Sequence, residues 1–274
     1  MSGARWSESF GAAARSSMQV YETVMVPRMF TPWAELLLDE LELADGEAVL
    51  DVACGPGSVA RLAAARVGAQ GRVVGCDLSA AMLAIAEQKP AVGGGAAIEY
   101  YEAPAEHLPV DDDEFDVATC QQGLQFMPDR PAALAEMRRT LRPGGRLGIA
   151  VWSEIESCPP MRVLAGALEA VIGADVAQRF SGGPWGFPDG RQLGELLEQA
   201  EFEDVRVRTR ALPVTFEGGA EQLVSILAAT PLAEVIDGLS PERRRHLIGL
   251  VAQELGEGPI TSQLESNIAL VRAA

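Results

Sequence analysis

Apolar runs of strand length alternate with segments of helical periodicity over the central part of the chain. A short apolar run bounded by turn residues is typical of a buried strand, and apolar positions three or four residues apart are typical of a covering helix. The strand-like runs lie at 47–53, 72–77, 97–103, 115–122 and 142–152. This alternation predicts a parallel sheet with helices on both faces.

Residue types at the segment boundaries predict where the covering helices begin and end. Ser58 stands where the N-cap of the first helix is expected, and Gly68 stands where that helix would end. Ser79 has the same N-cap position for the second helix. Asp129, followed by Pro131, predicts the start of the helix before the fifth strand.

The flanks lack the regular alternation. Residues 1–45 have helical periodicity, and 153–200 are predicted to be mostly helical around a loop rich in glycine, proline and aromatic residues. Two further strands are expected at 204–216 and 266–273, with helices between them. The pattern therefore predicts a single-domain, doubly wound α/β fold with a mostly parallel seven-stranded sheet and a helical lid.

Composition narrows the classes of partner. The formal net charge of −17 disfavours a nucleic-acid substrate and an anionic membrane surface. No apolar run reaches the length that crosses a membrane, and the start has no signal-peptide pattern, so we expect a cytoplasmic protein. Four cysteines without paired short spacing argue against a zinc site and a disulfide framework.

A glycine turn joins the first strand to the first helix. Residues 55–60 read Gly-Pro-Gly-Ser-Val-Ala, which also fits the dinucleotide-binding fingerprint. Asp77 follows at the end of the second strand, where an acid commonly accepts hydrogen bonds from the two ribose hydroxyls of a bound nucleotide. By itself, a glycine turn followed by an acid is weak evidence for a nucleotide site, because glycine turns and acids at strand ends are common.

Asp51, four residues before Gly55, helps to distinguish the cofactors. A carboxylate beside a pyrophosphate is electrostatically unfavourable, whereas a carboxylate beside an ammonium and a sulfonium is favourable. S-adenosylmethionine has both cations and a ribose. The alternative is that the side chain of Asp51 only caps the turn.

The motifs resemble those of the class I S-adenosylmethionine-dependent methyltransferases. "VLDVACGPGSVARLAAARV" resembles their first motif, and "VVGCDLSAAMLAIAE" resembles their ribose-binding segment. Residues 103–152 resemble their adenine-binding turn, fourth strand and Pro-Gly-Gly hairpin into strand five. The similarity is greatest to the small-molecule subgroup that includes quinone-biosynthesis enzymes. It implies a Rossmann-like fold with a lid segment over 1–45, a cofactor-binding core over 46–152, and substrate-lid helices with closing strands over 153–274.

The resemblance also implies ten cofactor-binding residues. Those expected at the methionine and ribose parts are Asp51, Ala53, Gly55, Gln121 (through its main chain) and Asp77. Those expected near the adenine are Leu78, Met82, Ala105 (through its backbone N–H) and Glu106. Tyr21 is expected to close over the cofactor from the N-terminal helix.

Two positions depart from the family pattern. Ala53 replaces the first glycine of the first motif, a common variation that leaves the turn feasible. Pro104 replaces the acid that precedes the adenine-site alanine, so a side-chain bond to the adenine amino group is in doubt unless Glu106 supplies it.

Methyl transfer from a sulfonium needs the nucleophile to be held in line with the methyl carbon, and it does not require an acid–base pair. No catalytic residue stands out: His107 and His246 are expected to be at the surface or beside the cofactor. The acceptor pocket is expected from the segments outside the motifs, at 1–35, 153–190 and 215–260. Aromatic residues concentrate there: Trp6, Tyr21, Phe30, Trp33, Trp152, Phe180, Trp185 and Phe187. The alternative for those aromatics is a second small core.

The sequence therefore predicts an enzyme that methylates an oxygen, nitrogen or carbon of a small metabolite, with no metal, nucleic acid or membrane partner, as a monomer or homodimer. The alternatives are a non-methylating protein that binds the same cofactor, for regulation or cyclisation, and an NAD-dependent oxidoreductase.

Overall fold

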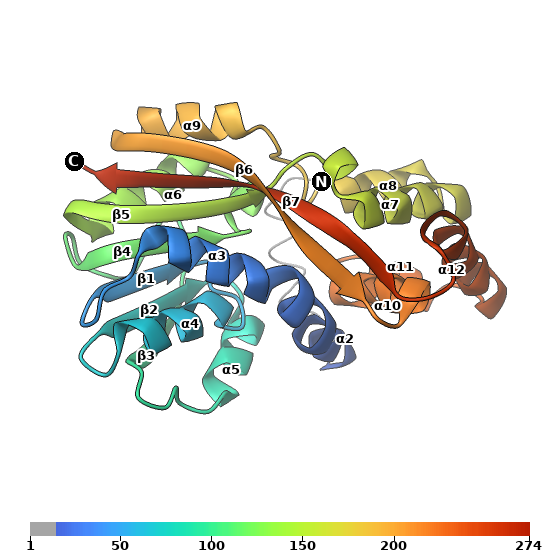
Figure 1. The fold of residues 1–274 in the computed structure, drawn as a ribbon, viewed down its shortest axis with the longest axis horizontal. Helices are drawn as coiled ribbons and strands as arrows, with labels where there is room; N and C mark the ends of the chain where they lie inside the picture. The colour runs from blue at the N-terminus through green and yellow to red at the C-terminus, as the bar shows by residue number, and fades with distance from the viewer. Residues whose placement is uncertain (1–14) are drawn as a thin grey trace.

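Seven strands form one sheet in the computed structural model, which describes residues 15–274 (Figure 1). The strand order is β3-β2-β1-β4-β5-β7-β6. The pairs among β1 to β5 are parallel, and β7 runs antiparallel to both β5 and β6. The strands are β1 (Ala48–Val52), β2 (Arg72–Asp77), β3 (Ala97–Glu102), β4 (Phe115–Gln121), β5 (Leu141–Trp152), β6 (Phe202–Phe216) and β7 (Ile260–Ala273). This arrangement confirms the predicted doubly wound, mostly parallel sheet.

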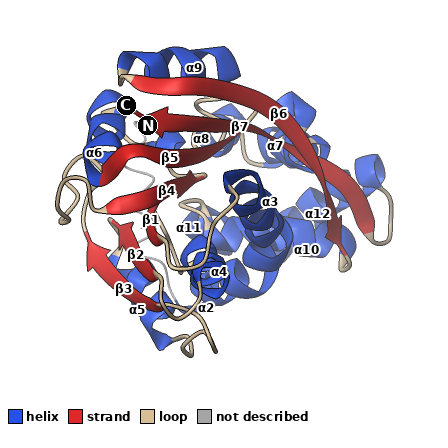
Figure 2. Cartoon of the chain, turned by 60° about the vertical axis from the view of Figure 1, so that its left-hand side comes forward, coloured by secondary structure: helices blue, strands red, loops and turns tan. Residues whose placement is uncertain are grey.

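Helices cover both faces of this sheet (Figure 2). The buried residues of α3 (Thr31–Leu41) and α4 (Ser58–Val67) belong to one apolar cluster, and those of α6 (Arg130–Thr140) and α9 (Gly190–Gln199) belong to a second. Helix α5 (Ala80–Gln88) connects β2 to β3. The two clusters lie on opposite faces of the sheet, as the near-continuous apolar strands require.

A helical lobe projects from the far end of β6 and β7, which extend beyond the other strands (Figure 1). It contains α7 (Pro159–Val171), α8 (Ala174–Ser181), α10 (Gly219–Ser225), α11 (Ala233–Asp237) and α12 (Pro241–Leu255), together with the 3-10 turn η4 (Ile226–Ala229). Short 3-10 turns also occur at Leu124–Phe126 (η2) and Ile155–Ser157 (η3). Buried residues of α7 and α10 belong to the same cluster as those of α3 and α4, so the lobe shares the core of the sheet.

The N-terminal segment contains a feature that the sequence pattern does not reveal. After α2 (Arg15–Val20), the chain is wound as a π-helix, η1 (Tyr21–Phe30), before α3 begins. The backbone N–H of Thr31 bonds the carbonyl of Val26, five residues earlier. π-Helical turns are rare in proteins, and a large share of those that occur lie at functional sites. The predicted helical character holds from residue 15 onward, and Trp6 lies outside the described residues.

Most helix boundaries agree with the sequence prediction, but one is wrong. Ser79 and Asp129 accept hydrogen bonds from the backbone N–H groups of Met82 and Ala132, as N-caps do. Ser58 is instead the first helical residue of α4 and caps nothing. Gly57 has the N-cap position, because the tight turn needs a left-handed residue there (φ 80°).

Candidate functional site

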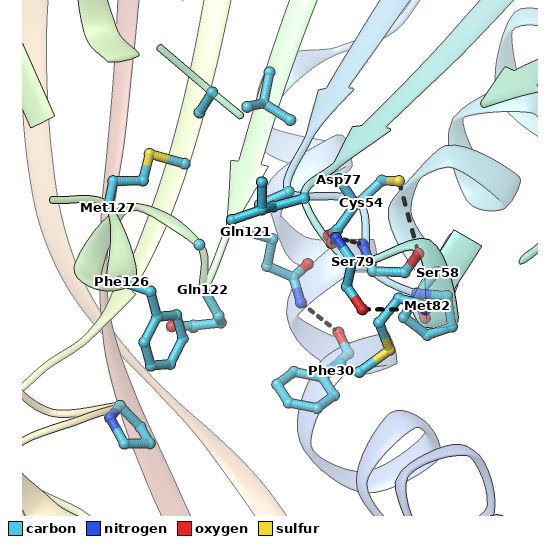
Figure 3. Close-up of a pocket in the computed structure, with 18 of the residues that line it drawn as sticks. Phe30, Cys54, Ser58, Asp77, Ser79, Met82, Gln121, Gln122, Phe126 and Met127 are labelled. Atoms are coloured by element: carbon cyan, nitrogen blue, oxygen red, sulfur yellow. Dashed lines mark hydrogen bonds between the residues drawn. The ribbon is translucent and has the colours of Figure 1, made fainter. Parts of the chain in front are cut away.

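A pocket opens at the carboxyl ends of β1, β2 and β4, where the strand order reverses (Figure 3). Open α/β sheets bind their ligands at this position. Its volume, including the part open to solvent, is about 1500 Å³.

All ten cofactor-binding residues predicted from the sequence line this pocket: Tyr21, Asp51, Ala53, Gly55, Asp77, Leu78, Met82, Ala105, Glu106 and Gln121. They come from η1, the turn after β1, the end of β2, α5, the loop after β3 and the end of β4. The fold therefore brings them together, while their individual roles stay predictions.

Asp77 supports the glycine turn from the end of β2. Its Oδ2 accepts a hydrogen bond from the backbone N–H of Gly55 at 2.8 Å, and its Oδ1 accepts one from Ser79 at 2.8 Å. Burial raises the pKa of this carboxyl, although both backbone bonds oppose the shift. A carboxylate oxygen accepts more than one hydrogen bond, so Asp77 retains acceptor capacity for a ligand.

Asp51 lies deeper, with 1% of its surface exposed. Its Oδ2 accepts from the N–H of Ala60 at 3.0 Å, and its Oδ1 accepts from the hydroxyl of Thr119 at 2.8 Å, the residue beside it on β4. Asp51 thus caps the first turn of α4, the role that the sequence assigned to Ser58. It also lines the pocket, so the two interpretations of Asp51 are compatible.

The two carboxylates form an uncompensated acidic pair. Burial is the main reason that the pKa of Asp51 is raised to about 7, and the nearby charge of Asp77 adds to the shift. Over residues 15–274, neither acid forms an ion pair: every hydrogen-bond donor to them is a backbone N–H or the Thr119 hydroxyl. A buried acid without a cation is unfavourable, so this part of the pocket suits a ligand with positive charge.

The turn that connects β1 to α4 approaches the pocket with its backbone. Ala53, Gly55 and Gly57 all have positive φ values, of 57°, 53° and 80°. Ala53 adopts a backbone conformation that glycine enters more easily. The resembled family has glycine at this position. A Cβ on Gly55 would meet no protein atom within 4 Å. The space beside Gly55 is therefore left for a ligand.

The part of the pocket around Asp51, Asp77 and Glu106 is called the cofactor half. Its adenine side has one apolar surface and one polar atom without a partner among the described residues. Leu78 is 46% exposed although it lines the pocket, and Met82 is buried next to it. Glu106 Oε1 is buried and has no hydrogen-bond partner within residues 15–274. His107 is exposed and is not part of the lining.

Gln121 connects the end of β4 to the N-terminal segment. Its Nε2 donates to the carbonyl of Phe30 at 3.0 Å, and its Oε1 is buried without a partner (Figure 3). Since the Phe30 carbonyl requires a donor, this bond fixes which end of the amide is the oxygen. The side chain of Gln121 therefore presents an unused acceptor, in addition to the main-chain role expected from sequence.

A continuous row of aromatic rings forms the other half of the lining. Ring centroids lie 5.3 Å apart for Tyr21 and Phe30, 6.5 Å for Phe30 and Trp152, 6.3 Å for Trp152 and Trp185, and 5.4 Å for Trp185 and Phe180. All five rings line the pocket. These separations are typical of favourable aromatic pairs.

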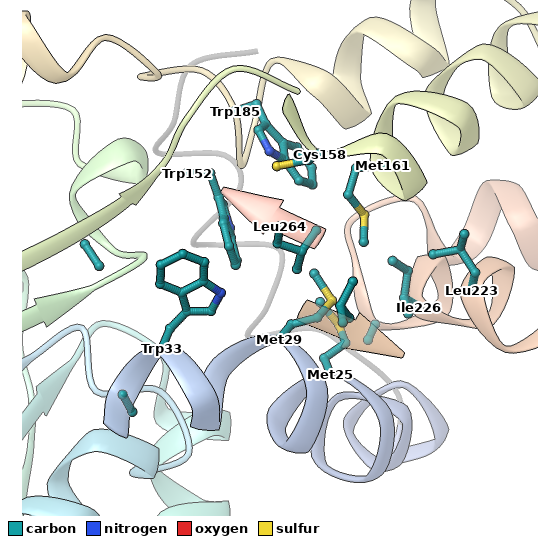
Figure 4. Packing of buried hydrophobic residues seen from close by; sticks show 14 of the residues in the cluster. Met25, Met29, Trp33, Trp152, Cys158, Met161, Trp185, Leu223, Ile226 and Leu264 are labelled. Carbon is teal, nitrogen blue, oxygen red and sulfur yellow. The ribbon is translucent and has the colours of Figure 1, made fainter. Parts of the chain in front are cut away.

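The sequence pointed to the segments that form this wall but not to all of its residues. Trp33 packs edge-on against Trp152 in the core and does not line the pocket (Figure 4). Phe187 does not line it either, because it lies under the Arg130 guanidinium in the second cluster. Residues missed by the sequence analysis are Met25, Met29, Gln122, Phe126, Met127, Ile226 and Thr230. Met25 and Met29 share a side with Tyr21 because residues four positions apart lie on one face of a helix, and this spacing in the sequence could have pointed to them.

Reactive cysteines, metal ligands and membrane spans each have a structural answer among the described residues. Cys54, Cys76 and Cys120 are free and buried, and burial raises the pKa of each thiol. In the part of the chain that the structure describes, no three His, Cys, Asp or Glu side chains are grouped as metal ligands would be. No described helix combines the length and apolar character of a membrane span.

Comparison with known proteins decides the family. The sequence model of the ubiE/COQ5 methyltransferase family matches residues 10–215. The chain belongs to this family. Membership in the ubiE/COQ5 family confirms the resemblance to S-adenosylmethionine-dependent methyltransferases of quinone biosynthesis, and it favours this class over an NAD-dependent oxidoreductase.

The curated relatives match less than half of the chain. A 2-phytyl-1,4-naphtoquinone methyltransferase of Thermosynechococcus vestitus is 44% identical over 117 residues, which is 43% of this chain and 51% of the relative. A demethylmenaquinone methyltransferase of Bacillus subtilis is 37% identical over 115 residues, or 42% and 49% of the two chains. The chain thus spans about half the length of these ubiE/COQ5-type relatives.

Solved structures agree on the fold. A putative methyltransferase from Bacillus halodurans has a TM-score of 0.59 at 21% identity, covering 88% of this chain and 98% of the other. A phosphoethanolamine N-methyltransferase of Haemonchus contortus, solved with S-adenosylmethionine, has a TM-score of 0.58 at 17% identity, covering 94% and 56%. At these identities the likeness shows the fold alone.

Proposed function

We propose that the protein transfers a methyl group from S-adenosylmethionine to a flat, uncharged aromatic small molecule of the quinol type. One observation carries the proposal: two buried carboxylates without a cation lie in the same pocket as an uncharged aromatic wall. The curated relatives act on quinones, which agrees with that wall. A cytoplasmic location and action as a monomer or homodimer stay predictions of the sequence.

The acidic half fits the cofactor. Asp51 provides negative charge for the ammonium and sulfonium, directly or through water, and Asp77 provides acceptors for the ribose hydroxyls. Leu78 and Met82 offer apolar contact to the adenine. Glu106 Oε1, buried without a partner, suits the adenine amino group, which is the role that Pro104 cannot fill.

The other half fits the acceptor. The charged residues among the pocket lining are Asp51, Asp77 and Glu106, all in the cofactor half. Aromatic rings, methionines, Ile226 and proline dominate the rest, with Gln122 and Thr230 as polar members. An apolar, flat site with few polar groups favours a neutral ring over a sugar, a phosphate ester or an amino acid.

The protein's part in the chemistry is orientation. When bound, the cofactor supplies an electrophilic methyl group with a good leaving group. The aromatic row holds a flat acceptor, and the apolar surroundings exclude water from the reacting atoms. Such positioning can lower a barrier by about 7–11 kcal/mol. The transfer breaks the bond between sulfur and the methyl carbon, forms a bond from that carbon to the acceptor, and releases S-adenosylhomocysteine and one proton from the acceptor. Solvent at the open part of the pocket is the acceptor for that proton, since the described lining contains no histidine.

The test has a binding arm and a turnover arm. Calorimetry is expected to show binding of S-adenosylmethionine and S-adenosylhomocysteine, and none of NAD. With radiolabelled S-adenosylmethionine, the protein is expected to methylate members of a panel of reduced naphthoquinols and benzoquinols, and not hydroxylated aliphatic acids of similar size. Tight NAD binding would overturn the cofactor assignment, and methylation confined to the aliphatic panel would overturn the acceptor assignment.

A further inference from the structure

Lys89 is the only lysine in a chain that has 22 basic residues. It follows the last turn of α5, and its ammonium contacts two segments from other parts of the sequence. The Nζ atom lies 2.8 Å from the carbonyl oxygen of Pro56 in the glycine turn and 2.8 Å from Glu22 Oε2 in η1. Both side chains of the ion pair are about a quarter exposed, at 22% and 25%. Lys89 thus joins α5, the glycine turn and the N-terminal segment.

The two segments that Lys89 joins border the same pocket. Pro56 lines it from the glycine turn, and Tyr21, adjacent to Glu22, lines it from η1. Glu22 has no other basic partner between residues 15 and 274, and its second carboxylate oxygen is buried without a hydrogen bond. Without Lys89, the start of η1 would hold an uncompensated, half-buried acid against the core, which is unfavourable.

Two other polar side-chain contacts of η1 lie towards its opposite end. At the far end, Gln121 bonds the carbonyl of Phe30. Nearer that end, Arg28 pairs with Glu217, whose side chain is 64% exposed. A compact ammonium with rotatable donors can serve a carbonyl and a carboxylate together, whereas the planar guanidinium of arginine has a fixed fork.

We propose that Lys89 is a positioning residue that latches η1 to the glycine turn and thereby slows the release of the cofactor. For the cofactor to leave the space between Pro56 and Tyr21, the start of η1 has to separate from the turn, and this separation breaks the contacts of Lys89. The inference rests on the proposed cofactor site and adds to it a residue that lies outside the pocket lining.

The test measures the release of S-adenosylhomocysteine from the full chain by stopped-flow chase, followed by the fluorescence of the tryptophans in the pocket. Lys89→Met is expected to raise the dissociation rate about tenfold and to change the association rate much less, as is usual for broken contacts. Lys89→Arg is expected to restore part of the effect. Glu22→Gln is expected to give a smaller rise, and adding it to Lys89→Met is expected to give no further rise.

Arg66 offers a matched control. It also bridges a carboxylate and a carbonyl, with 2.6 Å to Asp39 and 3.2 Å to the oxygen of Glu35, but it joins α4 to α3 away from the pocket. Arg66→Met is expected to lower the melting temperature less than Lys89→Met does, because the side chain of Asp39 is 69% exposed, and to leave the dissociation rate unchanged. Hydrogen exchange in Lys89→Met is expected to rise in residues 21–30 and to stay unchanged in the sheet.

The single lysine allows a second readout on the unaltered protein. Amine acylation followed by mass spectrometry is expected to modify Lys89 more slowly when S-adenosylhomocysteine is bound. If Lys89→Met and the unaltered protein both bind S-adenosylhomocysteine and release it at the same rate, the latch would be overturned and the proposed function would stand. Faster release accompanied by faster exchange across the whole sheet would also overturn the latch. A chain that does not bind S-adenosylhomocysteine would overturn the proposed function, and the latch with it.

Discussion

The two halves of the pocket are built in opposite ways. The cofactor half consists of backbone N–H groups and carboxylates at the ends of adjacent parallel strands, close together in the sequence. The acceptor half consists of rings from η1, the end of β5, α8 and the loop after it, which packing alone brings together. Hydrogen-bond geometry determines which ligand the first half recognises, while the second half selects by shape. Substitutions that alter one half and leave the other intact therefore test the whole proposal.

The largest expected effect is in the cofactor half. Asp77→Ala removes the acceptors for the ribose hydroxyls and leaves the N–H of Gly55 without its partner. The affinity for S-adenosylhomocysteine is expected to fall by about 2–3 kcal/mol, which is roughly a 30- to 150-fold rise in Kd. Calorimetry measures this value. Gly55→Val is expected to lose at least as much, because the branched side chain would enter the space left for the ligand.

The converse prediction concerns the acceptor half. Trp185→Leu shortens the aromatic row without touching the acidic pair. We expect kcat/KM for the quinol acceptor to fall roughly 30-fold, the loss of about 2 kcal/mol of aromatic contact, while the Kd for S-adenosylhomocysteine stays within twofold.

Phe187→Leu is the control for this prediction, since Phe187 lies in the core on the other side and not in the pocket. It is expected to affect stability more than turnover. If Trp185→Leu weakened cofactor binding as strongly as acceptor turnover, the division of the pocket into two halves would be wrong.

Asp51 connects charge, pH and stability. Its pKa of about 7, against 3.8 for an ordinary aspartate, means that the folded chain favours the protonated form, whereas a cationic ligand favours the ionised one. Affinity for S-adenosylmethionine is therefore expected to fall about tenfold from pH 8 to pH 6. Asp51→Asn retains acceptor and donor groups for Ala60 and Thr119, and it is expected to weaken binding at pH 8 and remove the pH dependence.

The same variant is expected to stabilise the fold. Because the folded-state pKa of Asp51 is raised, stability is lost as pH rises from about 4 towards 7, and the penalty is complete above 7. Asp51→Asn removes it, so the melting temperature at pH 8 is expected to rise, by roughly 2–4 °C for each kcal/mol recovered. The difference is expected to shrink as the pH is lowered. A lower melting temperature at pH 8 would show that the acid is stabilising after all.

The two halves also differ in how far the sequence predicts them. The order of strands and helices, the cap residues Ser79 and Asp129 and the glycine turn follow from local patterns, because a turn and the strands beside it are specified by neighbouring residues. The positions of Asp51 and Asp77 follow in the same way, whereas the other cofactor-binding residues were implied by the family resemblance. The capping role of Asp51 was anticipated only as an alternative, since Ser58 had the better residue type but the wrong position. Gly57 occupied that position for its backbone conformation.

The acceptor half was not predictable in the same way. That Trp185 lines the pocket and Phe187 does not depends on how a loop packs between α8 and α9, over residues far apart in sequence. The π-helical winding of η1 differs from that of an α-helix in its period, and the apolar pattern did not distinguish the two. Long-range packing and helix winding are thus the parts that needed the structure.

The smallest expected effect is at the adenine. Pro104 has no side-chain acceptor, and Glu106 has a buried oxygen without a partner in the same lining. If this oxygen accepts a hydrogen bond from the adenine amino group, Glu106→Leu is expected to raise the Kd for S-adenosylhomocysteine about fivefold, as the loss of one hydrogen bond does. For S-inosylhomocysteine, which has an oxygen in place of the amino group, the same substitution is expected to strengthen binding, because it removes a repulsion between two acceptors. Calorimetry with both ligands gives the ratio. An equal loss for both would mean that Glu106 acts through packing and that the amino group is held by the backbone alone.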